Sequence, residues 1–452
     1  MIPNDIPSLR IAVIGSGISG MSAAWLLSTR HSVTVYEKNA RLGGHTNTID
    51  VDGPDGDIAV DTGFIVYNEP AYPNLTALFQ HLGVTTKASD MSFAVSLDGG
   101  GFEYAGTDLN GLFAQRSNLL NPRFWSMLMD LRRFYREATR DLPSLGMISL
   151  GTYLDRHRFG AAFRDDHLLP MAAAIWSAPS STLLEYPAAS FIRFCDNHGL
   201  LRISGRPIWR TVDGGARTYI DALTARYADH IRLGNGAAAV ARTAAGVRVR
   251  DVRGAVEEFD HVVFACHGDE ALALLDDADQ HETAGLQAFR YSRNRALLHR
   301  DPALMPKRRR VWASWNYLGA RATAAATRDL CVTYWMNRLQ GIRADQPLFV
   351  TLNPIREPRP EMLIREEIYD HPIFDADALA AQQAIWARQG ARNTWFCGAH
   401  FGSGFHEDGL QSGLAVAERL GGVRRPWSVQ GESDRIPRFV PASPHPASAW
   451  VS

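Results

Sequence analysis

The N-terminal segment constrains the fold of this chain more than any other. Residues 9–14, LRIAVI, form a short run rich in β-branched side chains, which is typical of a buried strand. The run leads directly into GSGISG, residues 15–20, which has the spacing of a dinucleotide-binding turn. A segment of helical composition, MSAAWLLSTR, and a second strand candidate, SVTVYE, follow. This order predicts a Rossmann-type nucleotide-binding domain of the α/β class.

Each part of the motif has a physical role at a bound pyrophosphate. Gly15 permits the tight turn, Gly17 lets a phosphate approach the backbone because it has no Cβ, and Gly20 lets the helix pack closely on the strand. The helix N-terminus offers free N–H groups and the positive end of its dipole. Glu37 ends the second strand, where its carboxylate can accept hydrogen bonds from ribose hydroxyls and disfavours a 2′-phosphate. The alternative is a βαβ turn with a purely structural role.

The residues that follow Glu37 resemble the flavin-containing amine oxidoreductase superfamily, which includes amine oxidases, phytoene-type desaturases and protoporphyrinogen oxidases. The signature of that superfamily is GxGxxG, then Glu, then an R-x-G-G turn, which Arg41, Gly43 and Gly44 match. The resemblance implies that this turn contacts the FAD diphosphate, and that DTGFIVYN, residues 61–68, brings the chain to the flavin. Many members carry a second Arg after the glycine pair, whereas this chain has His45.

Within the superfamily, the chain is similar to a bacterial subgroup of predicted NAD/FAD-binding oxidoreductases. The similarity rests on RLGGHTNT, DTGFIVYN, LLPMAAAIWS, DNHGLL, WASWNY and GFHEDGL, and it runs from about residue 11 to residue 421. It implies FAD as the cofactor and an amine-oxidase-like, two-domain α/β fold with an interleaved mixed sheet and a helical substrate domain. The cofactor-binding residues expected from the motif and the resemblance are Gly15, Gly17, Ile18, Ser19, Gly20, Glu37, Lys38, Arg41, Gly43, Gly44, His45, Thr62, Gly63, Phe64, Val240, Gly398, Gly409, Leu410 and Ser412.

The length of 452 residues predicts more than one domain. An FAD-binding domain is expected from residues 9–70, 206–290 and 390–423, and a substrate-binding domain from residues 71–205 and 291–389. Residues 71–205 have mainly helical patterns, with a strongly amphipathic segment at 122–140 and an apolar core helix at 168–176. The segments GVRVRDVRG and HVVFACHGDEALALL are both interpreted as strands. The Pro- and Ser-rich residues 424–452 predict a loose C-terminal tail.

Two aromatic-rich segments, RVWASWNYL and LCVTYWMNRL, are strand candidates in the later part of the substrate domain. They suggest a sheet that floors a large apolar pocket, with ordinary core packing as the alternative. The candidate pocket residues are Trp315, Tyr317, Tyr334 and Trp335.

Near the C-terminus, GFHEDGLQSG places His406, Glu407 and Asp408 between glycines. The segment follows NTWFCGAHF, a predicted strand ending at Gly398, and precedes LAVAERLG, a predicted helix. The resemblance implies that this junction closes over the flavin, with a helix N-terminus at the N1/O2 edge where reduction builds negative charge. Many members have an acid after the strand-end glycine, where this chain has Ala399. We therefore expect a flavin-facing loop first, with His406 and Glu407 as candidate acid–base residues.

The lysine content of the chain separates two possible reactions. An amine oxidase typically has a lysine that holds a water near the flavin, on a strand that corresponds to residues 293–301, RNRALLHRD. That stretch contains Asn294 but no lysine, and the chain has lysine only at Lys38, Lys87 and Lys307. The leading hypothesis is therefore hydride transfer between a large apolar substrate and flavin. The best candidate for this substrate is a lipid acyl chain, which would undergo desaturation or saturation of a C–C bond. The alternatives are amine oxidation and a non-redox role, such as isomerisation.

Composition limits the partners and the setting. A net charge of −1 makes no general electrostatic case for a nucleic-acid partner. The four cysteines are far apart and form no CxxC pair, and neither a signal peptide nor an apolar window of about 18 residues is present. These features predict a cytoplasmic protein without a metal site. Residues 122–140 and KRRR at 307–310 leave open a peripheral contact with an anionic membrane face. The other expected partners are a small-molecule or lipid substrate and an electron acceptor of unknown kind.

Overall fold

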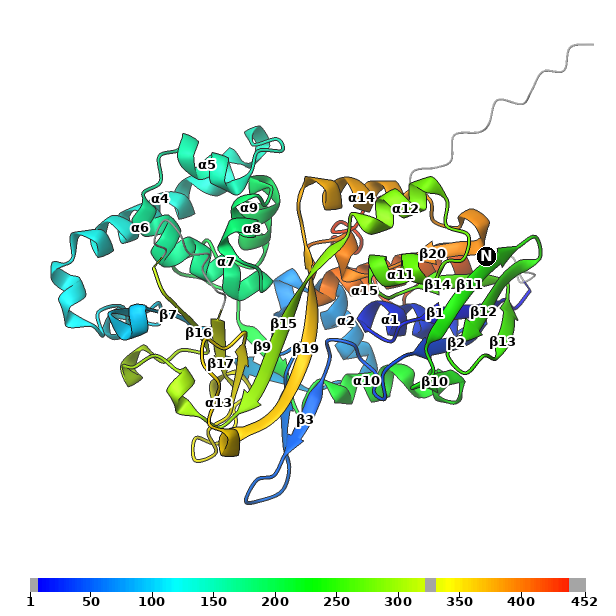
Figure 1. Ribbon diagram of the computed structural model, residues 1–452, viewed down its shortest axis with the longest axis horizontal. Coiled ribbons are helices and arrows are strands. Elements are labelled where there is room, and N and C mark those ends of the chain that lie inside the picture. The colour runs from blue at the N-terminus through cyan, green and yellow to red at the C-terminus, as the bar shows by residue number, and fades with distance from the viewer. Residues whose placement is uncertain (1–6, 322–330, 439–452) are drawn as a thin grey trace, which may run out of the picture.

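A five-stranded parallel sheet forms one half of the molecule in the computed structural model, which describes residues 7–321 and 331–438 (Figure 1). Its strands, in spatial order, are β10 (Ile231–Leu233), β2 (Ser32–Glu37), β1 (Arg10–Ile14), β14 (His261–Phe264) and β20 (Thr394–Phe396). The middle of β1 is fully buried, as expected for a strand that is covered on both faces. The helix α1 (Ile18–Leu27) connects β1 to β2, so the predicted strand–turn–helix–strand order is confirmed.

Two groups of helices and a small sheet surround the parallel sheet. One group consists of α1, α2 (Pro73–Leu82), α10 (Arg217–Thr224) and α15 (His406–Gly421), which pack against one another. The other consists of α11 (Gly268–Leu274), α12 (Gln280–Gln287) and α14 (Ala376–Trp386). The small antiparallel sheet consists of β11 (Ala237–Thr243), β12 (Gly246–Asp251) and β13 (Val256–Phe259). The prediction of a strand over HVVFACHGDEALALL is wrong for the second part of that segment, because β14 ends at Phe264 and α11 begins four residues later.

A seven-stranded mixed sheet forms the centre of the other half. Its strands, in spatial order, are β19 (Leu363–Ile373), β15 (Arg290–His299), β18 (Phe349–Leu352), β17 (Cys331–Trp335), β16 (Trp315–Gly319), β7 (Phe93–Leu97) and β8 (Phe102–Ala105). The pairing of β16 with β7 is parallel and the others are antiparallel. The two aromatic-rich segments are thus confirmed as neighbouring strands, β16 and β17.

Helices from residues 109–197 cover this second sheet at one end (Figure 1). They are α3 (Leu109–Leu112), α4 (Pro122–Asp141), α5 (Leu150–Arg156), α6 (Ala161–Phe163), α7 (Leu169–Trp176), α8 (Ser180–Leu184) and α9 (Ala188–Asn197). The amphipathic α4 buries Phe124, Met127 and Phe134, and α7 is almost entirely buried, as expected. The expectation of a mainly helical segment is nevertheless incomplete, because β6 (Thr86–Ser89), β7 and β8 also lie in it.

Short strands connect the two halves of the molecule. β3 (Thr48–Val51) pairs with β4 (Ile58–Asp61), while β9 (Trp209–Val212) pairs with both β5 (Tyr67–Asn68) and β6. The buried apolar side chains form two large clusters, one around the parallel sheet and one around the mixed sheet and the helices that cover it. The exact domain boundaries stay a prediction.

The segment after α15 is not a loose tail as far as residue 438. The Arg425 side chain is fully buried and donates to both carboxylate oxygens of Glu418, at 2.8 and 3.0 Å. The ring of Trp427 stacks on that of Trp25 with 5.8 Å between centroids. Composition suggested disorder, but these few side chains have specific buried partners on α1 and α15. The remainder of the predicted tail, residues 439–452, lies outside the described residues.

Within the part of the chain that the structure describes, no helix combines the length and the apolar character that a membrane span requires.

Candidate functional site

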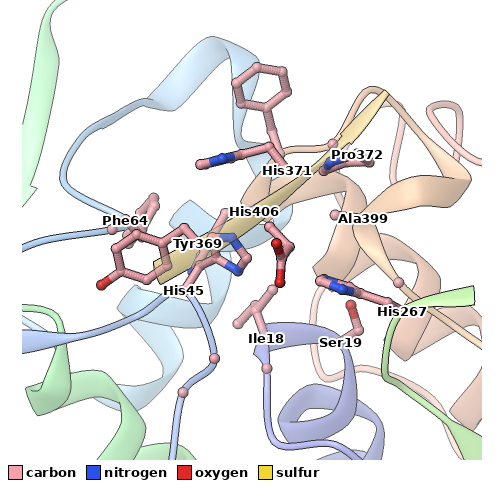
Figure 2. Close-up of a pocket in the computed structure, with 18 of the residues that line it drawn as sticks. Ile18, Ser19, His45, Phe64, His267, Tyr369, His371, Pro372, Ala399 and His406 are labelled. Carbon is pink, nitrogen blue, oxygen red and sulfur yellow. The ribbon is translucent and has the colours of Figure 1, made fainter. Parts of the chain in front are cut away.

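One large cavity, of about 990 Å³, runs from the glycine turn after β1 into the space between the mixed sheet and the covering helices. This volume is at the upper end of the roughly 300–1,000 Å³ that is usual for small-molecule sites. Figure 2 shows its middle part, with Ile18 and Ser19 of α1 on one side and His45, Phe64, Tyr369, His371 and His406 around it. We call the part beside the glycine turn the nucleotide half and the part beside the covering helices the apolar half.

The three glycines of the first turn have three different surroundings. A Cβ on Gly15, where φ is +104°, would lie 2.8 Å from the carbonyl oxygen of Ala265, and a Cβ on Gly20 would lie 2.0 Å from the carbonyl oxygen of Gly15. A Cβ on Gly17 would meet no atom within 4 Å. The backbone of Gly17 is therefore open to the cavity, while the other two glycines are required by close packing. This is the arrangement that lets a phosphate reach the backbone.

The first turn of α1 is available to an anion. Gly17 is its N-cap residue, and no side chain accepts hydrogen bonds from the first N–H groups. These free N–H groups and the helix dipole favour a phosphate. Gly44 lies against Gly17, because a Cβ on Gly44 would be 3.1 Å from the Gly17 Cα. The Arg41 guanidinium donates to the Gly44 carbonyl at 2.7 Å and so holds this second turn over the first.

Glu37 lies at the nucleotide end of the cavity with a fixed, buried carboxylate. One oxygen accepts from the backbone N–H and the hydroxyl of Ser16, at 3.0 and 2.6 Å. The other accepts from the backbone N–H and the side-chain amide of Asn39, at 2.8 and 2.9 Å. The neighbouring Lys38 lines the cavity and forms an ion pair with Glu270. Both residues thus lie where the motif places the adenosine part of a dinucleotide.

Val240 does not lie at the cavity. It is fully buried, and its carbonyl accepts from the backbone N–H of Asp276 at 3.1 Å. The predicted adenine contact is therefore misplaced by a few residues, because Gly236, directly before β11, and Ala237, the first residue of β11, line the cavity instead. A hairpin register cannot be located from an alternating apolar pattern alone.

The C-terminal junction differs from the predicted loop. α15 begins at His406 rather than near Leu414, so that Gly409, Leu410 and Ser412 lie inside the helix and do not line the cavity among the described residues. A Cβ on Gly409 would lie 2.9 Å from atoms of Ile18 and Ser19 on α1, so this glycine permits helix packing. The Ser412 hydroxyl accepts from the N–H of Gly398 at 2.9 Å. Gly398 itself lines the cavity.

The two candidate acid–base residues separate in the structure. His406 lines the cavity, stacks on Phe64 with 3.8 Å between ring centroids, and has its Nε2 within 2.9–3.0 Å of the hydroxyls of Tyr219 and Thr46. Glu407 points away and is fully buried. Its oxygens accept from the backbone N–H groups of Asn74 and Leu75 at the start of α2, each at 3.0 Å. The prediction that Glu407 is an acid–base residue is therefore wrong, because its carboxylate caps α2 and does not face the cavity.

Several residues predicted for the middle of the cavity do line it, namely Ile18, Ser19, Gly43, His45, Thr62, Gly63 and Phe64. Sequence reasoning did not recognise how many histidines meet there: His45, His198, His267, His371, His400 and His406 all line the cavity. Burial lowers the pKa of His371 to about 4 and that of His406 to about 3, so both rings are neutral at pH 7. The Nε2 of His45 is buried without a hydrogen-bond partner among the described residues. A buried polar atom of this kind at a cavity wall fits a bound polar group.

The apolar half contains two of the four aromatic residues proposed for it. Trp315 and Tyr334 line the cavity on paired positions of β16 and β17. Tyr317 is buried in the core beyond the cavity, and Trp335 points to the opposite face of β17, where its indole N–H bonds to Asn337. The residues that sequence reasoning missed come from other elements: Met91, Ile175, Trp176, Phe194, Leu200, Trp209 and Leu352.

None of the three lysines of the chain lies at the meeting point of the two halves. Lys38 is at the nucleotide end, Lys87 pairs with Asp213 and Lys307 is exposed. In the strand where the resemblance implies a lysine, Asn294 is buried and bonds to the ring of His371. Among residues 7–321 and 331–438, no group of His, Cys, Asp and Glu side chains is arranged to hold a metal ion.

The parallel sheet, the open glycine turn and the buried acid at the end of β2 define a Rossmann-type protein for a dinucleotide cofactor. A family model described as flavin containing amine oxidoreductase matches residues 18–338. The chain therefore belongs to this family of FAD-dependent oxidoreductases, and FAD is its cofactor. The open Gly17, the uncapped first turn of α1 and the free Nε2 of His45 all fit such a group.

Solved structures with a similar fold include a fatty acid isomerase from P. acnes that produces CLA, at 15% identity and a TM-score of 0.66, with 93% of this chain and 99% of that chain covered. A cyclohexylamine oxidase from Brevibacterium oxydans IH-35A has 16% identity and a TM-score of 0.65, with 92% and 100% covered. A putrescine oxidase bound to putrescine has 15% identity and a TM-score of 0.65, with 92% and 99% covered.

A curated relative matches a short stretch of the chain. It is a 4,4'-diapophytoene desaturase (4,4'-diaponeurosporene-forming) of Staphylococcus aureus, 44% identical over 46 residues, which are 10% of this chain and 9% of the relative. These comparisons establish the family and the fold, and the substrate follows from neither.

Proposed function

We propose that the chain transfers a hydride between the acyl chain of a lipid and FAD, and so desaturates or saturates a C–C bond. The observation that carries the proposal is the continuity of the cavity, whose nucleotide half leads without a wall into an apolar half. That apolar half is lined by aromatic and aliphatic side chains from the sheet and from α7 and α9, including Ile175, Phe194 and Trp315. A long apolar substrate could bury its hydrocarbon there at roughly 0.8 kcal/mol for each CH₂ group.

FAD supplies the two-electron chemistry, and the protein supplies orientation and a cavity with little water. In desaturation, one C–H bond of the substrate would break with its electron pair leaving as hydride. FAD held at Gly17 and the first turn of α1 would supply the acceptor of that hydride. The neighbouring carbon loses a proton to a base or to water, and the electron pair of its C–H bond becomes the π bond. Saturation is the reverse of these steps. A complete cycle in the desaturating direction needs an electron acceptor that takes two electrons from the reduced cofactor.

The chain has three lysines, and none of them lies at the meeting point of the two halves. This favours C–C bond chemistry over amine oxidation. The neutral histidines there carry no fixed positive charge at pH 7 and do not disfavour an apolar substrate.

The test is anaerobic mixing of the purified, FAD-loaded protein with candidate substrates, followed by its visible spectrum. Bleaching of the flavin by oleate or methyl oleate, but not by putrescine or cyclohexylamine, would support the proposal. Bleaching by the amines alone would establish amine oxidation instead. Bleaching by dithionite but by none of the candidates would favour a non-redox role. A direct product analysis by mass spectrometry, for loss of two hydrogens from the acyl chain, separates desaturation from isomerisation.

A further inference from the structure

A short relay of side chains behind the meeting point of the two halves holds the ring of His371 in one state. The relay runs from Asn353, the residue directly after β18, through Asn294 on β15 to His371 on β19. Asn294 is almost fully buried, and none of these contacts includes a charged group. Because each amide has one accepting and one donating end, the direction of the relay is determined once its ends are known.

The first end is determined by a backbone N–H group. The N–H of Arg295, which can only donate, bonds to the side-chain oxygen of Asn353 at 2.9 Å. The Asn353 amide nitrogen therefore faces Asn294 and donates to its side-chain oxygen at 2.6 Å. Asn353 has a left-handed backbone with φ of +46°, and its own N–H donates to the Arg295 carbonyl at 2.8 Å. Asparagine tolerates this conformation well, which explains how the side chain can return to the same residue that its backbone contacts.

The second end is determined by a carbonyl group. The Asn294 amide nitrogen donates to the carbonyl oxygen of Ser292 at 2.9 Å, and a carbonyl can only accept. The same nitrogen lies 2.9 Å from the Nδ1 of His371 and 3.2 Å from the Ser292 hydroxyl, and an amide nitrogen can only donate. Nδ1 must then accept, so it carries no proton. Burial lowers the pKa of this ring to about 4, and a neutral imidazole has a single proton, which must reside on Nε2.

The position of His371 makes this state relevant to a ligand. Its ring lines the cavity, with 5.3 Å between its centroid and that of His45, which follows the diphosphate turn (Figure 2). Two residues earlier on β19, the Tyr369 hydroxyl is held by Thr62 at 2.7 Å and by Asn47 at 3.0 Å. The strand is thus anchored on one side of His371, and the relay anchors the ring itself. Nε2 lies on the side of the ring opposite Asn294.

We propose that His371 presents a fixed, neutral Nε2–H donor at the meeting point of the two halves, where it binds an unprotonated hydrogen-bond acceptor of the bound molecules. That acceptor is either a carbonyl or ring nitrogen of the flavin, or a carbonyl or carboxylate oxygen of the lipid. The second source rests on the proposed function, and the first does not. In this state the ring has no free lone pair, so His371 recognises a ligand and does not accept a proton from it.

The state of the ring is tested first by ¹⁵N NMR of FAD-loaded protein with labelled histidine, since the ring-nitrogen shifts distinguish protonated from unprotonated nitrogen. His371→Gln identifies the signals by their loss. The expected result is a protonated Nε2 and an unprotonated Nδ1. In Asn294→Asp the carboxylate cannot donate, so the proton is expected to appear on Nδ1. The matched control is Asn316→Asp, a fully buried position of the same sheet that contacts main-chain groups of residues 313 and 333 and no histidine. A protonated Nδ1 in the unaltered protein would overturn the proposal.

The source of the acceptor is tested with His371→Leu, which removes the donor, and His371→Gln, which can replace it. If the acceptor belongs to the flavin, the leucine variant shifts the flavin absorption maxima and midpoint potential, and the glutamine variant restores much of the change. If the acceptor belongs to the lipid, the flavin properties of the leucine variant stay constant. Its dissociation constant for oleate or methyl oleate then rises by about 2- to 13-fold, the loss expected for one hydrogen bond. The control is His299→Gln on β15, a buried histidine that bonds to Thr351 outside the cavity.

A folded, FAD-loaded leucine variant in which neither property changes would overturn the proposal. A flavin shift in the leucine variant, together with no oleate binding by the unaltered protein, would support this inference while counting against the proposed lipid substrate.

Discussion

Substitution of two neighbouring glycines separates cofactor binding from folding. Gly17 and Gly20 belong to the same motif, but a Cβ at Gly17 would meet no protein atom within 4 Å, whereas a Cβ at Gly20 would lie 2.0 Å from the Gly15 carbonyl oxygen. Gly17→Ala therefore fills space that the protein leaves open, and Gly20→Ala forces α1 away from the turn. We expect the first to weaken FAD binding in a folded protein and the second to destabilise the protein itself.

The magnitudes follow from the geometry. The backbone of Gly17 has φ of −66° and ψ of 175°, which alanine adopts easily, so the apoprotein should change by no more than about 1 kcal/mol. A methyl group at that position displaces a phosphate from at least one N–H group, and a hydrogen bond to a charged group contributes about 1.5–3 kcal/mol. The dissociation constant for FAD should rise by about 10- to 150-fold. Gly20→Ala should lower the free energy of unfolding by about 1–3 kcal/mol or more, as overpacking does.

The assay has two measurements on the same apoproteins: thermal unfolding without FAD, and titration with FAD followed by flavin fluorescence. The expected result is an unchanged Tm with weak binding for Gly17→Ala, and a reduced Tm for Gly20→Ala. Equal losses of Tm in the two variants, or wild-type FAD affinity in Gly17→Ala, would refute the assignment of the open space to the diphosphate.

Three further outcomes test the rest of the structure. Glu407→Gln should lower the free energy of unfolding in urea by about 1–3 kcal/mol without altering the flavin spectrum, because a capping acceptor is lost; unchanged stability with lost turnover would return Glu407 to catalysis. Burial lowers the pKa of His198 to about 3, below its unfolded value, so its contribution to stability is complete above about pH 6.5 and is lost as the pH falls towards 3. His198→Asn should therefore flatten the acid loss of apoprotein stability by up to about 1.4 kcal/mol per pH unit, and an identical slope would contradict this. Finally, Leu119 and Leu120 are 46% and 89% exposed beside the amphipathic α4, and changing both to Gln should reduce cosedimentation with anionic vesicles; equal binding to neutral vesicles would exclude the electrostatic contact.

The N-terminal part of the site could be predicted because its signals are local. The buried strand, the glycine spacing and the terminal acid all lie within residues 9–37, and each acts on neighbours that are close in sequence. The R-x-G-G turn could be placed on the same cavity because it follows directly. For such segments, local geometry leaves few alternatives, and the structure confirms the order of the elements.

The C-terminal junction was misplaced because glycine has more than one physical use. Gly409 and Gly413, close to acidic residues, suggested a loop, since glycine is a poor helix former. In the structure, both lie in α15, where a Cβ on Gly413 would be 2.2 Å from the Ser19 carbonyl oxygen of α1. The loss of helix propensity is offset by close packing of the two helices that carry the cofactor site. In a turn, a Cβ is excluded because of the backbone conformation. At Gly413 a Cβ is excluded because α1, which is far away in the sequence, packs too closely.

The meeting point of the two halves depends on strand register, which no local pattern contains. Asn294 meets His371 because β15 and β19 pair with Ser292 opposite His371, and a shift of one residue would turn one of the two side chains to the other face. The resemblance could locate the strand on which a lysine is missing, but not the histidine that the asparagine contacts. A cofactor held by local turns can therefore be inferred from the sequence, whereas the groups at the meeting point of the two halves depend on the pairing of distant strands. This difference explains why family membership determines FAD here, whereas the contact between Asn294 and His371 emerges only from the paired strands.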